Sequence, residues 1–383
     1  MKRILFTTTN LGVPSGGSEM LWSKAAKSMA SHDGYSVGAL LKNWSPVPNH
    51  VVELADNGVK LFFFPDTAAI PISKEKILVN RLLPSHLQFK PQESKPQFED
   101  LEDFNPDLVV VSFGDLFQDS FVTKFLIEKR IPYITIIQLV GEFSLKNDYY
   151  IQRSLEYFEN SLMNCFLSRK NIDLAEQLLG AKIPNLAIVK NPCSESPAYL
   201  PYPSTMNGYR LAFPARMHTL HKGLDILLKV MSHEKWKERN LVVNCFGDGP
   251  NKEQLNRLKS MWKVENVNFL PYTDDIAEVW RNHHALVMSS RMEGHPLVAV
   301  EAMACGRMVI TTNVGAGDEF VTQHKNGFIA EAATVQALDA TLEEAWMMRE
   351  QWQVMGKTAL ETAREFLKTD PVLDFVNLVD SKI

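Results

Sequence analysis

Short apolar runs alternate with stretches of helical periodicity along the first half of the chain. Apolar runs bounded by turn residues predict buried strands, and apolar positions three and four apart predict the helices that cover them. The predicted strands are Arg3–Thr7, Ser36–Leu41, Val59–Phe64, Leu108–Val111 and Tyr133–Ile137, with a helix at Phe121–Glu128. This alternation predicts an α/β fold in which a parallel sheet carries helices on both faces.

The alternation continues to about residue 190, where a proline-rich segment interrupts it. The last elements predicted before this segment are helices at Tyr150–Leu162 and Asn171–Leu179 and strands at Asn164–Leu167 and Asn185–Val189. Residues 191–204 contain four prolines and are typical of a linker. A second series follows, with strands at Tyr209–Phe213, Leu241–Cys245 and Ala285–Met288 and a helix at Leu224–Val230.

This interruption predicts two domains of similar size, as expected for 383 residues, because single cores stop growing at about 250–300 residues. We assign residues 1–190 to the first domain, 191–207 to the linker and 208–360 to the second domain. Residues 361–383 form a final helical segment. Residues 65–103 lack periodicity, and we expect irregular helices and loops there.

Charge and composition narrow the function classes. The chain has 40 Lys and Arg against 45 Asp and Glu, and the absence of a strongly basic half argues against a nucleic-acid partner. Its four cysteines are far apart and form no metal-ligand spacing. Neither a secretion signal nor an apolar window of roughly 20 residues is evident. We expect a cytoplasmic protein, associated with the inner face of a membrane at most peripherally.

The most informative stretch is Glu293-Gly-His-Pro-Leu-Val-Ala-Val-Glu301, which follows a predicted strand. Pro296 suits the first turn of a helix and Gly306 its end. Unpaired N–H groups at such a helix start attract an anion such as phosphate. Glu293 on the loop and Glu301 in the helix suit the hydroxyl groups of a nucleotide-sugar, although the spacing also fits an ordinary strand and helix with solvated carboxylates.

A glycine turn, Gly16-Gly17, follows the first strand, and we expect Ser18 to cap the next helix. The turn is not the Gly-x-Gly-x-x-Gly of dinucleotide sites, so a nicotinamide cofactor is poorly supported.

Two cations, Arg216 and Lys222, flank the loop after the strand at Tyr209–Phe213. A further glycine turn that includes Gly247 follows the next strand. Ligands of open α/β sheets bind at the carboxyl ends of strands, so both cations are candidates for phosphate contacts.

Together these residues resemble the retaining glycosyltransferases of family four, whose GT-B architecture has two Rossmann-like parallel-sheet domains facing across a cleft. The resemblance covers nearly the whole chain in the family's order. The matching pieces are Gly16-Gly17-Ser18-Glu19, Arg216 with Lys222-Gly223, Gly247-Asp-Gly-Pro250, the Glu-x7-Glu block and Asn326-Gly327-Phe328. It implies an amino-terminal acceptor domain, a carboxy-terminal donor domain and a final helical segment that packs back toward the first domain.

The resemblance also implies catalytic roles for Glu293, Arg216 and Lys222. The cations would neutralise the diphosphate as the glycosidic bond breaks, and Glu293 would contact the sugar near its reacting carbon. Glu301 would accept the ribose hydroxyls, while backbone N–H groups hold sugar and phosphate. The implied donor-binding residues are Gly16, Gly17, Arg216, Lys222, Gly247, Glu293, Gly294, His295, Leu297, Val298 and Glu301.

No Asp-x-Asp pair occurs in the sequence, so we expect no metal and no other cofactor. The expected donor is a nucleotide-sugar, with a UDP-sugar favoured and a GDP-sugar as the alternative. The expected acceptor is a hydroxyl of a glycan, a lipid-linked glycan or a small molecule.

The chain departs from the family on the acceptor side. Where the family commonly has a His after the fifth strand, this chain has Gln138, with Glu142 nearby, and an amide cannot shuttle a proton. A further departure is Ala215, where a Gly often precedes the family's Arg. Two alternatives therefore stay open: another GT-B enzyme, such as a nucleotide-sugar epimerase, and a catalytically silent nucleotide-sugar binding protein.

Overall fold

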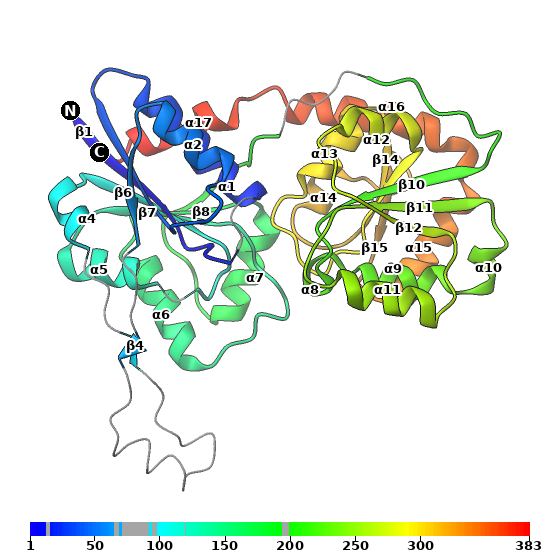
Figure 1. The fold of residues 1–383 in the computed structure, drawn as a ribbon, viewed down its shortest axis with the longest axis horizontal. Coiled ribbons are helices and arrows are strands. Elements are labelled where there is room, and N and C mark those ends of the chain that lie inside the picture. The colour runs from blue at the N-terminus through cyan, green and yellow to red at the C-terminus, as the bar shows by residue number, and fades with distance from the viewer. Residues whose placement is uncertain (13–15, 65–68, 71–91, 94–97, 119, 194–198) are drawn as a thin grey trace, which may run out of the picture.

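Two parallel sheets, each flanked by helices, form the two halves of the molecule (Figure 1). A computed structural model describes the chain except for residues 13–15, 65–68, 71–91, 94–97, 119 and 194–198. The first sheet has seven strands in the order β3-β2-β1-β6-β7-β8-β9, and the second has six in the order β12-β11-β10-β13-β14-β15. This arrangement confirms the predicted α/β class with two parallel-sheet domains.

The amino-terminal domain is built on the seven-stranded sheet. Its strands are β1 (Lys2–Thr8), β2 (Tyr35–Leu41), β3 (Lys60–Phe63), β6 (Leu108–Phe113), β7 (Tyr133–Ile137), β8 (Met163–Phe166) and β9 (Leu186–Ile188). Its helices are α1 (Gly17–Ala30), α2 (Asn49–Asp56), α4 (Glu99–Phe104), α5 (Phe121–Lys129), α6 (Asp148–Glu159) and α7 (Arg169–Leu179). Every residue of β6 and β7 is buried, because helices cover both faces, and this explains their continuous apolar sequences.

The carboxy-terminal domain repeats this plan. Its strands are β10 (Tyr209–Pro214), β11 (Leu241–Phe246), β12 (Val267–Leu270), β13 (Ala285–Val287), β14 (Met308–Thr312) and β15 (Gly327–Ala330). Its helices are α8 (Thr219–Lys222), α9 (Leu224–Met231), α10 (Glu234–Lys237), α11 (Lys252–Met261), α12 (Ile276–Asn282), α13 (Leu297–Ala304), α14 (Gly317–Phe320), α15 (Val335–Met347) and α16 (Trp352–Phe366), with a 3₁₀ turn η2 (Arg349–Gln351) before α16.

All the strands predicted from the sequence are confirmed, but the prediction omitted β12, β14 and β15. The prediction that Ser18 caps the first long helix is wrong, because Gly16 is the N-cap and Ser18 lies inside α1. Within the span 65–103, two short antiparallel strands, β4 (Ala69–Ile70) and β5 (Gln92–Glu93), and the start of α4 are described. The rest of that prediction lies outside the described residues.

The order of the strands sets the place of a ligand site. In the first sheet β1 pairs with both β2 and β6, and in the second β10 pairs with both β11 and β13. These are the points where the strand order reverses, and ligands of open α/β sheets bind beyond the carboxyl ends of the strands there. The loops after β1, β10 and β13 contain candidate site residues that the sequence analysis identified.

The end of the chain returns to the amino-terminal domain. Helix α16 keeps Trp352 and Ala363 in the core of the carboxy-terminal domain, so it runs across the predicted boundary at residue 360. Helix α17 (Pro371–Asp380) then packs on α1, with Phe375 buried in the core of the first domain. Figure 1 shows both chain ends on this domain. The assignment of residue ranges to domains stays our proposal.

Phe375 tests how strongly the returning helix stabilises the first domain. Its side chain is 1% exposed, so Phe375→Ala should lower the free energy of unfolding by about 3–5 kcal/mol. Leu373→Ala on the same helix is the control, because Leu373 is 54% exposed and should change stability little. Urea unfolding measures both. Equal effects of the two variants would contradict the packing of α17 described here.

Candidate functional site

A buried turn connects β13 to α13 and carries Glu293. Ser289 and Ser290 are fully buried behind it, and Pro296 is the N-cap of α13. The sequence predicted Pro296 in the first turn of the helix, but the helix begins one residue later, at Leu297, and ends at Ala304. Gly306 follows with φ 77°, so the predicted glycine stop is confirmed. Glu293 lies on the loop and Glu301 on the helix, as predicted.

Lys222 and Glu293 form an ion pair across this turn. The Lys222 Nζ lies 2.6 Å from Glu293 Oε1, and Ser290 Oγ donates to the same oxygen at 2.7 Å. The Glu293 side chain is only 8% exposed and that of Lys222 is 27% exposed. A carboxylate this deeply buried is stable in its charged form when it is paired and hydrogen bonded. Two predicted catalytic residues, 71 positions apart in sequence, therefore meet directly.

Helix α8 holds Lys222 against the end of β13. Gly223, which follows the lysine, has φ 61°, and a Cβ there would collide with the carbonyl oxygen of Ser289. The Ser289 hydroxyl donates to the carbonyl oxygens of Gly223 at 2.8 Å and Lys222 at 3.2 Å. The close approach of these two backbones fixes the base of the lysine side chain, and it requires a glycine after the lysine.

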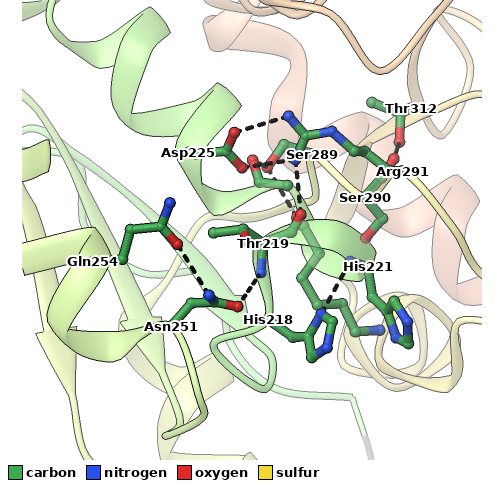
Figure 2. Close-up of polar contacts among 12 residues, drawn as sticks. His218, Thr219, His221, Asp225, Asn251, Gln254, Ser289, Ser290, Arg291 and Thr312 are labelled. Atoms are coloured by element: carbon green, nitrogen blue, oxygen red, sulfur yellow. Dashed lines mark hydrogen bonds and ion pairs between the residues drawn. The ribbon is translucent and has the colours of Figure 1, made fainter. Parts of the chain in front are cut away.

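A second polar network braces the same turn (Figure 2). Arg291 binds Asp225 through two hydrogen bonds of 2.7 and 2.8 Å and also donates to the carbonyl oxygen of Thr219 at 2.7 Å. Thr312 Oγ1 donates to the carbonyl oxygen of Ser290 at 2.5 Å. Bidentate Arg–carboxylate pairs are among the strongest side-chain contacts. The sequence analysis missed this network, since no local spacing joins residues 225, 291 and 312.

Arg216 lies on the loop after β10 with an exposed side chain. Within the described part of the chain, its guanidinium makes no hydrogen bond or ion pair. The predicted donor residue Gly247 lies behind this loop, where a Cβ would collide with the carbonyl oxygen of Ala215. Ala215 and Met217 N–H groups donate to Phe246 and Asp248. The glycine turn therefore supports the backbone that presents Arg216.

Three histidines near these loops are neutral at pH 7. Burial lowers the pKa of His221 and of His295 to about 4, with neighbouring cations adding to the effect, and burial also lowers the pKa of His218. The His218 and His221 rings lie 4.1 Å apart between centroids, which a pair of cations would not tolerate (Figure 2). The positive charge available to an anion here therefore comes from Arg216 and Lys222.

The His295 side chain points into the protein. Its ring stacks on Phe366 at 4.9 Å between centroids, meets Phe320 edge-on at 5.8 Å, and neither ring nitrogen has a hydrogen-bond partner among the described residues. Only the backbone of His295 remains for the predicted donor contact. The next predicted contacts, Leu297 and Val298, open α13, whose first turn has no side-chain cap. Glu301 lies farther along this helix and is half-buried.

The glycine turn of the amino-terminal domain reaches this helix. A Cβ on Gly17 would lie 3.6 Å from the Leu297 side chain, and Gly16 is the N-cap of α1. Behind the turn, Glu19 accepts hydrogen bonds from Asn10, Ser18 and other neighbours, and burial raises its pKa. The two predicted glycines and the start of α13 thus lie together, although they come from different domains.

Gln138 lies at the same meeting point, but its side chain is occupied. It donates to Ser112 Oγ at 3.2 Å and accepts from Asn191 Nδ2 at 3.0 Å, and it is 5% exposed. Its backbone carbonyl lies against Gly294, where a Cβ would collide with it. The amide therefore holds the domain junction, while Glu142, the other predicted acceptor-side residue, is exposed.

A further contact between the domains supports the turn that carries Glu293. Lys170 Nζ at the start of α7 donates to the Asn313 side chain and to its carbonyl oxygen at 3.0 Å, and Arg169 N donates to Glu319 at 3.1 Å. The loop that they hold donates from Ala316 N to the carbonyl oxygen of Gly294 at 3.1 Å. The sequence analysis did not single out any residue of this contact.

Within the described residues, no group of three or more His, Cys, Asp or Glu could hold a metal ion. In the same residues, no helix is long and apolar enough to span a bilayer.

The family model described as "Glycosyl transferases group 1" matches residues 208–347. An uncharacterized glycosyltransferase of Haemophilus influenzae is 34% identical over 122 residues, which are 31% of this chain and 34% of that protein. N-acetyl-alpha-D-glucosaminyl L-malate synthase of Bacillus anthracis is 27% identical over 163 residues, 39% of this chain and 43% of that protein. The matched stretch thus spans between a third and a half of these curated relatives.

Solved structures match over the full length. HepE of Anabaena, in complex with UDP-glucose, aligns with a TM-score of 0.69 and 16% identity over 100% of both chains. Sucrose-phosphate synthase of Thermosynechococcus elongatus aligns with a TM-score of 0.71 and 15% identity over 100% of this chain and 99% of that one. At these identities the likeness establishes the fold.

Substitution of Lys170 tests whether the amino-terminal domain supports the turn that carries Glu293. Lys170→Met removes the contacts to Asn313, so the Ala316 amide should exchange with solvent about tenfold faster, the equivalent of one lost charged hydrogen bond. Lys182→Met is the control, because Lys182 is 86% exposed and its one ion pair within the described parts of the chain is with Glu176 of its own domain. Hydrogen exchange measures both variants. An unchanged Ala316 amide in Lys170→Met would show that the turn does not depend on this contact.

Proposed function

We propose that the protein is a retaining, metal-independent glycosyltransferase, because residues 208–347 match the model of the group 1 glycosyltransferases and the chain as a whole has the GT-B fold. It transfers a sugar from a nucleoside diphosphate to a hydroxyl of a glycan, a lipid-linked glycan or a small acceptor. The observation that carries this proposal is the Lys222–Glu293 ion pair at the amino-terminal end of α13, with Arg216 nearby on the next loop of the same sheet edge.

The proposed donor lies along this edge with its diphosphate at the start of α13. Arg216 and Lys222 offset the negative charge that develops on the diphosphate as the glycosidic bond breaks, and fixed charges cost no rearrangement at that moment. Lys222 then divides its hydrogen bonds between the phosphate and Glu293. The Glu293 carboxylate contacts the sugar near its reacting carbon, and Glu301 accepts the ribose hydroxyls.

A UDP-sugar is the favoured donor, and a GDP-sugar is the alternative. The complex of HepE with UDP-glucose supports this choice, because HepE shares the fold of this chain. Two cations of the chain and the absence of an Asp-x-Asp pair support a reaction without a metal. We place the reaction in the cytoplasm, with peripheral contact to the inner face of a membrane if the acceptor is lipid-linked.

The proposed acceptor approaches from the amino-terminal domain. A cavity of about 830 Å³ opens beside Gly16 and Gly17 and is lined also by Trp44 and, from the other domain, Tyr272. A cavity of this size holds a sugar-sized ligand, and its aromatic walls suit the apolar face of a sugar ring.

One observation favours the silent binding protein as a second candidate. Gln138 is committed to Ser112 and Asn191, and an amide cannot act as a proton shuttle. The discriminating experiment incubates the protein with a UDP-sugar in excess chelator and measures UDP release with and without candidate acceptors. Acceptor-dependent release supports the transferase; UDP binding without release under any acceptor supports the silent protein.

The two cations give a sharper test of the mechanism. Arg216→Ala and Lys222→Ala should each lower turnover by about 10²-fold or more, because each removes a fixed charge that faces the leaving diphosphate. Lys252→Ala is the matched control, since Lys252 pairs with Asp248 on the neighbouring exposed turn at 3.0 Å. Steady-state rates with saturating donor measure all three. Near-normal turnover of folded Lys222→Ala would remove Lys222 from the catalytic site.

A further inference from the structure

A cavity lies at the hinge, where the chain crosses twice between the domains. It has a volume of about 580 Å³ and is lined by residues from 190–193 at the first crossing, residues from 366–372 at the second, and Lys24 of α1. Lys24 also lines the proposed acceptor cavity, whereas the residues of the two crossings belong to neither the proposed donor site nor the proposed acceptor cavity. We refer to it as the hinge cavity.

Two lysines give the hinge cavity an excess of positive charge. Lys24 and Lys190 are both half-buried, and neither ammonium makes a hydrogen bond or an ion pair with any residue that the structure describes. Among the lining residues that the structure describes, the one carboxylate is that of Asp370, whose Oδ1 caps α17 by accepting from Val372 N at 2.9 Å and Leu373 N at 3.2 Å. Half-buried charges of like sign around one cavity favour an anion between them.

The remaining wall of the hinge cavity is largely apolar. Pro192, Phe366 and Val372 contribute to it, and Lys190 Nζ lies 4.3 Å from the centre of the Phe366 ring. A ligand suited to this surface carries a doubly charged group for the two ammoniums and a carbon skeleton for the apolar wall. A phosphate monoester carries between one and a half and two negative charges at about pH 7.

Two contacts connect the hinge cavity to the turn that carries Glu293. Phe366 stacks on His295, and Asn191 donates to Gln138, whose backbone carbonyl lies against Gly294. Each crossing of the chain thus contacts a residue that touches the Glu293–Pro296 loop or belongs to it. A ligand held between the crossings would restrain both of them at once.

We propose that the hinge cavity binds a small phosphate monoester, such as a sugar phosphate, and that its occupancy stabilises the present arrangement of the two domains. The ligand's phosphate lies between Lys24 and Lys190, and its carbon skeleton lies against Phe366 and Pro192. The site is distinct from the proposed donor site, so the proposal does not depend on the transferase activity.

Calorimetric titration of the full chain with glucose 6-phosphate, with excess UDP present to fill the donor site, tests the proposal. The wild-type protein should bind glucose 6-phosphate and should not bind glucose. The variant Lys24→Gln/Lys190→Gln should bind about 100-fold more weakly, at about tenfold for each lost charged contact. The matched control is Lys229→Gln/Lys259→Gln, which removes the same charge from ammoniums over Trp262 and Phe269 and should retain wild-type affinity.

Hydrogen exchange of the wild-type protein locates the ligand without any variant. Glucose 6-phosphate should slow exchange of amides in residues 190–193 and 366–372. Slower exchange at the Arg216 and Lys222 loops alone would place the phosphate at the donor site, and slower exchange in residues 44–50 alone would place it in the acceptor cavity; either result would overturn the proposal. Absence of binding by the wild-type protein, or equal affinity of the Lys24→Gln/Lys190→Gln variant, would overturn it as well.

Discussion

The buried ion pair between Lys222 and Glu293 is the interaction on which the site depends. It joins α8 to the turn after β13, and both partners are held from behind, Lys222 by the Gly223–Ser289 backbone contact and Glu293 by Ser290. Removing either partner leaves a charge without its counterpart at a largely buried position, which is costly. The charge of each partner therefore has to be balanced, either by the other partner or by a ligand. In the reaction that we propose, the diphosphate of the donor shares the lysine with Glu293.

The two domains complete this arrangement together. Gly17 lies close to the Leu297 side chain, and the Gln138 carbonyl lies against Gly294. Lys170 binds the loop whose Ala316 amide donates to the carbonyl oxygen of Gly294. Glycine at position 294 is required because the other domain's backbone passes where a side chain would be. The turn that carries Glu293 is thus shaped partly by the domain that we propose binds the acceptor, which links acceptor-side structure to donor-side geometry.

The sequence predicted those features that depend on local pattern. Buried parallel strands are continuous apolar runs, so β1, β6, β7 and β10 were identified, and the positions of Glu293 and Glu301 relative to α13 followed from strand, loop and helix signals. The cap of α1 was assigned wrongly, because Ser18 is a good cap residue and its hydroxyl instead binds Glu19. Pairing of Lys222 with Glu293, the Arg291–Asp225 network and the inward His295 ring involve residues distant in sequence, and no local spacing encodes them.

The most direct test of the central claim is calorimetric binding of UDP to Lys222→Met, Glu293→Gln and Glu301→Gln. UDP lacks the sugar, so Glu293→Gln should keep wild-type affinity, because its loss also frees the Lys222 ammonium for the diphosphate. Lys222→Met and Glu301→Gln should each lose at least tenfold, the equivalent of one charged hydrogen bond at about 1.5–3 kcal/mol. A loss of UDP affinity in folded Glu293→Gln as large as that in Glu301→Gln would contradict the assignment of these residues to sugar and ribose.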